Sequence, residues 1–404
     1  MTAPKPEPLY FGSEVRARSG WLHRGVGPSS SGVVICNPFG FEAICAHRTL
    51  RHLADSLAGA GLPTLRFDYD GTGDSAGDDR DPKRLEAWIE STRDACTALR
   101  ELCGVERVWL VGLRLGALVA TLAAVGERHI AGLVAIAPVV VGKTYLRELS
   151  AFQTTLELEA PPAGAPAVPG PDGGQEALGF LLTPETRKAV SETNLAKLPD
   201  TLGRGDAPPF AVLALDRQDL PTADKWMAHL AAQGADVEAR RVDGYLEMMV
   251  DPHKSVVPTA VLREVTDWLV RRASAAEGTP RSTPSRPPQV RTEAVFGDVV
   301  ETPVFVDEAG LLFGIFSRPT KVSASGRSII LLNAGSIHHI GPNRLHVRLA
   351  RAWAAAGHEV IRLDITGIGE SSVRTGQEEN VVYSPHALED VVAAVEFCRR
   401  RGAR

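Results

Sequence analysis

The sequence has few cysteines and no long hydrophobic run, and each absence excludes a class of protein. Five of the 404 residues are cysteine, at irregular spacings and without a Cys-X-X-Cys pair, which is not the pattern of a disulfide framework. No apolar run reaches about 18 residues. The N-terminal segment MTAPKPEPLYFG lacks the basic flank and the apolar stretch of a signal peptide. We therefore expect a cytoplasmic protein with reduced thiols and no membrane partner.

An excess of charge of one sign is also missing. The formal net charge is −5 and the isoelectric point is near 6.2, so nothing favours binding to nucleic acid or to an anionic membrane. Hydrophobic residues make up 44% of the chain and charged residues 23%, a balance typical of packed globular domains. The length of 404 residues indicates two domains rather than one.

Short apolar segments alternate with helical periods, which predicts an α/β fold with a mostly parallel sheet and helices on both faces. Strands are expected at 32–36, 64–67, 108–111, 132–136, 210–215 and 237–242. Helices are expected at 46–60, 84–102, 115–125 and 257–271.

Composition divides the chain into two domains. We expect a first domain at 1–273, with a cap inserted at about 142–205 over the carboxyl edge of the sheet. The Pro/Ser-rich segment at 274–293 predicts a linker. The second domain then occupies 294–404.

The second domain begins like the first. Residues 37–75 align with 333–371 without a gap at a constant offset of 296, and about a third of the positions are identical. The identical positions include Arg48 and Arg344, Arg66 and Arg362, Asp68 and Asp364, Gly73 and Gly369, and Ser75 and Ser371. This agreement predicts a tandem repeat whose second copy is partial. We expect a partner chain or a downstream domain to complete it.

One segment has the pattern of a nucleophile elbow. In VWLVGLRLGALVA, residues 108–120, a strand-like run ends at Gly112, and an alanine-rich helix begins at Gly116. Glycines flank such an elbow because larger side chains would collide there. The central residue, normally the nucleophile, is Arg114. The alternative is that the two glycines only allow close packing of a strand and a helix.

An acid and a histidine follow in the order that acyl transfer requires. Asp219 comes after the strand-like FAVLALD, with Asp216 as the second choice, and His253 lies in the loop after the last predicted strand. Simpler roles remain open: Asp219 could serve a turn before Pro221, and a lone loop histidine is often only solvated.

Backbone donors for an oxyanion hole are expected at the residue after the elbow and in the loop after the first predicted strand. These are the N–H groups of Leu115 and of the segment around Phe39 and Gly40. Cys36 and Cys45 lie beside this loop as weaker candidate nucleophiles, since buried thiols are usually inert.

Two adjacent histidines, His338 and His339, lie in the second domain where the first has its oxyanion loop. They could suggest a metal site. Adjacent side chains in a strand point to opposite faces, however, and no third ligand lies at short range. We expect no metal here.

The elbow, the segment RFDYDGTGDS, the cap and the late acid and histidine together resemble the α/β-hydrolase superfamily. The strings NPFGFE, GLRLGA and GYLEMMVDPH are most similar to exosortase-A-system-associated hydrolases, which are related to serine aminopeptidase-like hydrolases. The resemblance implies an α/β-hydrolase fold, hydrolysis of esters, thioesters or amides, and no cofactor. In relatives with two such domains, the second usually carries the serine.

Arg114 conflicts with that activity, because a guanidinium stays protonated and cannot act as a nucleophile. Its buried charge should need a carboxylate partner, with Asp219, Glu42 and Asp251 as candidates. We expect either a catalytically impaired partner domain of a tandem hydrolase, or a binding protein that clamps a small acyl or anionic ligand through Arg114. A hydrolase with a displaced nucleophile is a third possibility.

Overall fold

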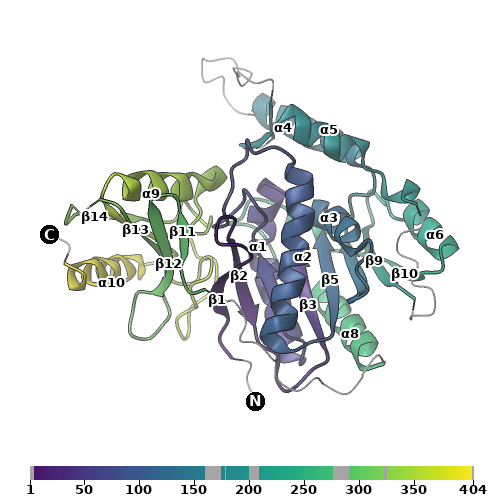
Figure 1. Ribbon diagram of the computed structural model, residues 1–404, viewed down its shortest axis with the longest axis horizontal. Coiled ribbons are helices and arrows are strands. Elements are labelled where there is room, and N and C mark those ends of the chain that lie inside the picture. The colour runs from purple at the N-terminus through teal and green to yellow at the C-terminus, as the bar shows by residue number, and fades with distance from the viewer. Residues whose placement is uncertain are drawn as a thin grey trace.

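The computed structural model contains two large β-sheets with their helices, which lie side by side (Figure 1). We call the part built on the N-terminal sheet the first domain and the part built on the C-terminal sheet the second domain. The described residues are 4–159, 174–177, 179–199, 209–275, 291–322 and 325–402. The Pro/Gly-rich middle of the predicted cap and most of the predicted linker at 274–293 lie outside these residues.

An eight-stranded sheet with the order β1-β2-β4-β3-β5-β6-β9-β10 forms the centre of the first domain. Its strands are β1 (Glu7–Phe11), β2 (Arg18–His23), β3 (Ser31–Cys36), β4 (Thr64–Phe67), β5 (Arg107–Leu113), β6 (Ile130–Ile136), β9 (Ala211–Arg217) and β10 (Asp236–Val242). All six predicted strands are confirmed and pair in parallel. The antiparallel strands β1 and β2 were not predicted.

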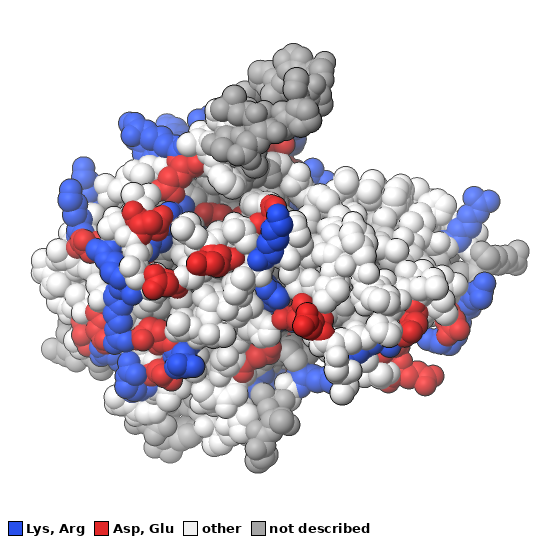
Figure 2. All heavy atoms as spheres, turned by 180° about the vertical axis from the view of Figure 1, so that it is seen from behind, with Lys and Arg blue, Asp and Glu red and all other residues white. Residues whose placement is uncertain are grey.

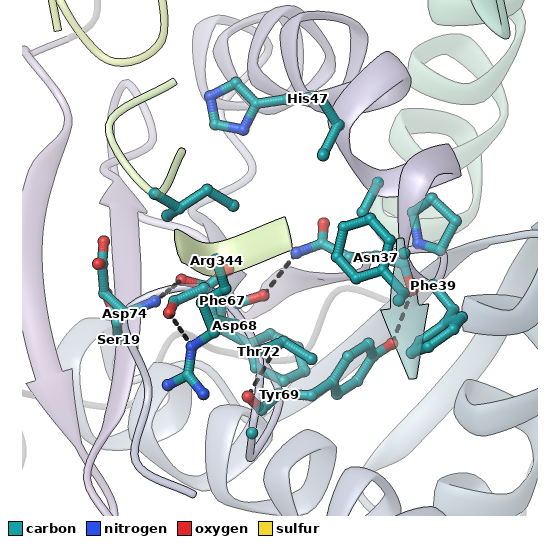
Figure 3. Close-up of a pocket in the computed structure, with 18 of the residues that line it drawn as sticks. Ser19, Asn37, Phe39, His47, Phe67, Asp68, Tyr69, Thr72, Asp74 and Arg344 are labelled. Carbon is teal, nitrogen blue, oxygen red and sulfur yellow. Dashed lines mark hydrogen bonds between the residues drawn. The ribbon is translucent and has the colours of Figure 1, made fainter. Parts of the chain in front are cut away.

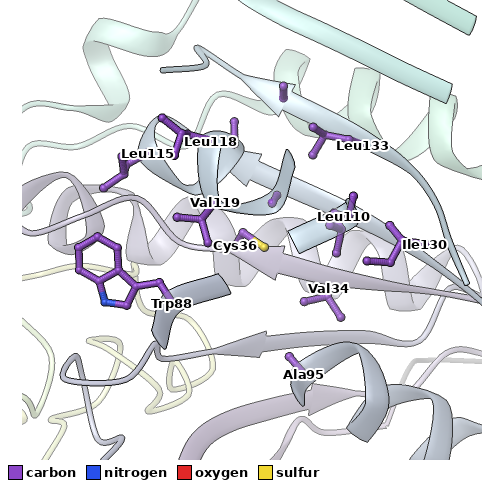
Figure 4. Close-up of a cluster of buried hydrophobic side chains, with 14 of the residues drawn as sticks. Val34, Cys36, Trp88, Ala95, Leu110, Leu115, Leu118, Val119, Ile130 and Leu133 are labelled. Atoms are coloured by element: carbon purple, nitrogen blue, oxygen red, sulfur yellow. The ribbon is translucent and has the colours of Figure 1, made fainter. Parts of the chain in front are cut away.

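Helices cover both faces of this sheet because its central strands are apolar on both sides. Val34 and Cys36 of β3 pack with one apolar cluster, shown in Figure 4, whereas Val33 and Ile35 pack with another on the opposite face. The helices are α1 (Phe41–Gly59), α2 (Arg84–Cys103), α3 (Leu115–Ala124), α6 (Asp224–Ala232), α7 (Tyr245–Met248) and α8 (Thr259–Ala275). The four predicted helices are confirmed within a few residues, and the arrangement is the expected α/β-hydrolase fold.

The insertion between β6 and β9 lies over the carboxyl ends of the strands (Figure 1). Its described elements are α4 (Gly142–Glu159), the hairpin of β7 (Gln175–Ala177) and β8 (Phe180–Leu182), α5 (Pro184–Glu192) and η1 (Leu195–Lys197). Phe180 packs on Phe39, with ring centroids 6.0 Å apart. The hairpin therefore covers the loop that follows β3.

The second domain has a mixed five-stranded sheet with the order β11-β12-β13-β15-β14. Its elements are β11 (Ala294–Phe296), β12 (Val299–Phe305), β13 (Phe313–Pro319), β14 (Ser328–Leu331), η2 (Pro342–Arg344), α9 (Leu345–Ala355), β15 (Glu359–Leu363) and α10 (Ala387–Arg400). Only β14 and β15 pair in parallel, and the other neighbours are antiparallel.

Charged side chains of both signs are interspersed on the face shown in Figure 2. No single-sign field covers that face, in keeping with the balanced composition. Among the helices that the structure describes, none combines the length and apolarity needed to cross a membrane.

Candidate functional site

Arg114 occupies the sharp turn between β5 and α3. Its backbone has φ 53° and ψ −120°, a conformation that residues other than glycine adopt only under strain. A Cβ on Gly116 would lie 2.2 Å from the carbonyl oxygen of Cys36, and one on Gly112 would lie 2.4 Å from Cα of Ala117. Only glycine fits at either position, so the tight turn predicted from the sequence is present.

The guanidinium of Arg114 is buried and bonded at all three nitrogens. Nε donates to Glu42 at 2.8 Å, Nη2 donates to Glu148 at 2.5 Å, and Nη1 donates to the carbonyl oxygen of Ala137 at 3.4 Å. The predicted carboxylate partner is thus Glu42, rather than Asp219 or Asp251. Glu148 was missed because it lies on the inserted helix α4, and no sequence motif indicates that this helix packs next to the elbow.

Two tyrosine rings complete the surroundings of Arg114. The guanidinium carbon lies 5.3 Å from the ring centre of Tyr145 and 5.8 Å from that of Tyr245, within the range of a cation–π interaction. Tyr145 also donates its hydroxyl to Glu42 at 3.0 Å. Tyr245 follows Gly244 directly after the last strand, a position that sequence reasoning could have examined for a residue facing the elbow.

The acid and histidine proposed from the sequence lie elsewhere. Asp219 has a side chain 46% exposed and pairs with Arg217. Asp216 is buried and accepts the backbone N–H groups of Thr222 and Ala223 at 2.7 and 2.8 Å, which holds the start of α6. His253 is exposed, and no hydrogen bond or ion pair links it to any described part of the chain. The structure therefore does not bring Asp219 or His253 into contact with Arg114.

The expected oxyanion segments line a cavity that Arg114 does not reach. Phe39, Gly40 and Leu115 all border a cavity of about 100 Å³. Arg114 borders a different one, of about 190 Å³, with Tyr145 and Glu148. The residues expected to supply the backbone donors and the elbow side chain thus border separate cavities.

The cavity of about 100 Å³ lies between the two domains, and we call it the interdomain cavity. Both domains and the inserted hairpin contribute to its walls (Figure 3). Its lining includes Asn37, Phe39, Asp68, Tyr69, Arg84 and Trp88 of the first domain, Phe180 of the hairpin, and His338, His339, Arg344 and Glu370 of the second domain.

His339 joins the domains beside this cavity. Its Nε2 lies 2.7 Å from Asp74 of the first domain and its Nδ1 lies 2.7 Å from Asp364 of the second. Burial opposes the charge, but the two carboxylates raise the pKa of His339 to about 10. His338 instead stacks on His47, with ring centroids 4.0 Å apart. Each histidine thus has a structural partner.

Neither of the weaker candidate nucleophiles is activated. Burial raises the pKa of Cys36 and of Cys45 to about 12, so both thiols stay protonated at neutral pH. Within the described ranges, no three His, Cys, Asp or Glu side chains are grouped to hold a metal ion.

Comparison with known proteins gives the following similarities. The family model described as serine aminopeptidase, S33, matches residues 44–165. Est1E from Butyrivibrio proteoclasticus, solved with ferulic acid, is 17% identical with a TM-score of 0.45 and covers 66% of this chain and 99% of its own. GrgF from a Penicillium species is 18% identical with a TM-score of 0.46, covering 67% and 100%. The Pyrococcus furiosus esterase Pf2001 is 15% identical with a TM-score of 0.42, covering 66% and 92%. No curated protein matches significantly.

Proposed function

We propose that this chain is a noncatalytic relative of the ester, thioester and amide hydrolases of the α/β-hydrolase superfamily. The observation that carries the proposal is the bonding of Arg114 at the elbow. A guanidinium cannot attack an acyl carbon. Moving it aside would leave the carboxylates of Glu42 and Glu148 unpaired in a largely buried site, which is costly.

The position of the other expected catalytic groups supports the same conclusion. A nucleophile needs a base within hydrogen-bonding reach, and that base needs an orienting partner. Here the aromatic ring of Tyr245 lies next to the elbow, while Asp219 pairs with Arg217. No described histidine hydrogen-bonds to Arg114.

The alternative, in which Arg114 clamps an anionic ligand, has less support. Each guanidinium nitrogen already donates a hydrogen bond, and Glu42 and Glu148 together outweigh the single positive charge. A further anion would have to displace one carboxylate. If the protein binds an anionic ligand, the interdomain cavity is the better place to look for it.

We also propose that the second domain is the first part of a second hydrolase-type copy. Its strands β14 and β15 pair as Ile330 with Ile361, and the residues 296 positions earlier, Val34 and Leu65, pair in the same way in β3 and β4. The loops after β4 and β15 also match in their hydrogen bonds. Asp68 accepts the N–H of Asp74 at 3.0 Å, and Asp364 accepts that of Glu370 at 3.0 Å.

One edge of the second sheet supports the idea that a partner chain or downstream domain completes it. β3 pairs with strands on both sides, whereas β14 pairs only with β15 within the described residues. Leu388 of α10 is 72% exposed, while Thr92, 296 positions earlier in α2, is fully buried. Apolar surface and an open strand edge both favour association.

The catalytic part of the proposal is tested by labelling the purified chain with a fluorophosphonate and by assaying an activated ester. We expect neither labelling nor turnover above the buffer rate. The Arg114→Ser variant should also stay unlabelled, since Tyr245 rather than a base lies beside the elbow. Stoichiometric labelling of the natural chain that His253→Ala abolishes would overturn the proposal.

A further inference from the structure

A buried arginine without a carboxylate partner lies in the wall of the interdomain cavity. Arg84, the first residue of α2, is 3% exposed. Its Nη1 makes long hydrogen bonds to the carbonyl oxygens of Leu181, at 3.2 Å, and Asp79, at 3.4 Å. Its Nε is buried and bonds to no described residue, and no described carboxylate lies within ion-pair distance of it. A buried cation without an ion pair is uncommon, because desolvation is expensive.

Two aromatic rings only partly offset this cost. The guanidinium carbon of Arg84 lies 4.9 Å from the ring centre of Trp88 and 5.8 Å from that of Phe39. Cation–π contacts of this kind contribute about 1–2 kcal/mol, less than an ion pair would in a buried site. The position at a helix N-terminus is also unfavourable for a cation. Burial lowers the pKa of Arg84 to about 10, although the carboxylates of nearby aspartates, Asp79 foremost, act in the opposite direction.

The remaining charges of the lining are mostly paired with each other. The pairs are Arg66 with Glu370, Arg348 with Asp79, and Asp74 with both Arg362 and His339. Arg344 donates to the backbone carbonyl oxygens of Gly73, Ser75 and Gly77 and makes no ion pair with a described residue. Asp68 is the one lining carboxylate without a described cationic partner, and burial raises its pKa to about 6. The lining therefore has two cations without a described ion-pair partner, Arg84 and Arg344, against one such carboxylate, Asp68.

From this imbalance we propose that the interdomain cavity binds a small organic carboxylate, with Arg84 as its ionic partner. The planar guanidinium fork matches the two oxygens of a carboxylate. Phe39, Trp88 and Phe180 supply an apolar wall for a short hydrocarbon tail. The small volume of the cavity, about 100 Å³, limits the hydrocarbon tail of the ligand to a few carbons, as in butyrate.

Such a ligand would touch both domains, because the cavity lies where His338, His339 and Arg344 meet Phe39 and Arg84. Binding should therefore stabilise the packing of the two domains against each other. This inference does not depend on whether the elbow is catalytic, since no hydrolysis is involved.

The test is calorimetric titration of the full chain with butyrate, with the neutral isostere butyramide, and with inorganic phosphate. We expect butyrate to bind at least about tenfold more tightly than butyramide, as charge-assisted hydrogen bonds predict. The Arg84→Gln variant should lose most of that affinity. Arg93→Gln is the matched control on the same helix, because Arg93 donates to the carbonyl oxygens of Ala123 and Val125 outside the cavity, and it should bind butyrate normally.

Three results would overturn the proposal. One is the absence of butyrate binding to the natural chain. Another is equal affinity for butyrate and butyramide, which decides the matter even if Arg84→Gln does not fold. The third is binding of phosphate in preference to butyrate, which would exclude a carboxylate as the ligand class.

Discussion

Arg66 of β4 donates two hydrogen bonds, of 2.9 and 2.8 Å, to the carboxylate of Glu370 in the second domain. The residues 296 positions away form the reciprocal contact, in which Arg362 of the second domain pairs with Asp74 of the first. All four side chains are almost fully buried. The two domains therefore meet through an exchange of buried ion pairs, and such pairs hold one geometry because a shift would leave charges unpaired.

Removing either member of the first pair should destabilise the protein strongly. We expect Arg66→Met or Glu370→Gln alone to lower the free energy of unfolding by about 3–5 kcal/mol, and the double variant to cost less than the sum by about 1–3 kcal/mol. Urea unfolding of the natural chain, the two single variants and the double variant measures the coupling between Arg66 and Glu370. The exposed pair Arg318 and Glu293, at 3.2 Å, is the control and should show almost no coupling. Additive effects of Arg66→Met and Glu370→Gln would contradict the expectation.

We expect the free energy of unfolding to fall at alkaline pH, because the folded protein holds His339 in its protonated form. Its folded pKa of about 10 is above the unfolded value of about 6.5, so its contribution is complete below about pH 6.5 and is lost as the pH rises through 10. Asp74 and Asp364 pair with its two ring nitrogens, and Arg362 also pairs with Asp74. His338 and His346 are the other titratable groups beside it.

Urea unfolding of the natural chain and of His339→Gln between pH 6 and 10 measures this effect. The difference between the two free energies of unfolding should shrink with rising pH, by on the order of a few kcal/mol over the whole titration. Groups that do not interact with His339 titrate alike in both proteins and cancel from the difference. Asp74 and Asp68 do not cancel, because His339 lowers their pKa values, so the alkaline part of the range decides the comparison. A constant difference across this range would show that His339 is not held in its charged form.

Features that depend on local pattern were predictable from the sequence, and those that depend on tertiary contacts were not. Strand β5 and its elbow followed from an apolar run ending at Gly112, since only glycine allows that turn. Strand β2 was missed because its segment RSGWLH contains the polar residues Arg18 and His23. Both are buried, but in the sequence they interrupt the apolar pattern that is typical of a buried strand. Glu148 and Arg84 became apparent only from neighbours far away in the chain.

The steric demand at the elbow predicts that Gly116→Ala is destabilising. The new Cβ would lie 2.2 Å from the carbonyl oxygen of Cys36 and 2.5 Å from that of Asn37. Both oxygens belong to the backbone, so they could move away only if the backbone were distorted. We expect a loss of at least about 3 kcal/mol. Gly59→Ala at the end of α1 is the control, because its Cβ would meet no atom within 4 Å and should leave stability unchanged or raise it by up to about 1 kcal/mol. Equal effects of the two substitutions in thermal unfolding would argue against the close approach at the elbow.

The final prediction separates a structural role of Arg114 from a ligand-binding role. Arg114→Met keeps a side chain of similar length and does not change the backbone strain, since neither residue is glycine. It leaves Glu42 and Glu148 without their cation, so we expect a loss of about 2–4 kcal/mol in the free energy of unfolding. Adding Glu42→Gln should recover part of this loss, because one of the two unpaired carboxylates is then neutral.

Arg217→Met provides the comparison, because Arg217 also lies over the ring of Tyr245, at 4.6 Å, but pairs with the exposed Asp219. Its substitution should cost less than about 1 kcal/mol. An anion clamp at Arg114 would behave differently. Its carboxylate neighbours would oppose ligand binding, so Glu42→Gln alone would tighten the binding of an anion and Arg114→Met would abolish binding with little effect on stability. Chemical unfolding of the four variants, with anion titration of each, distinguishes the two roles.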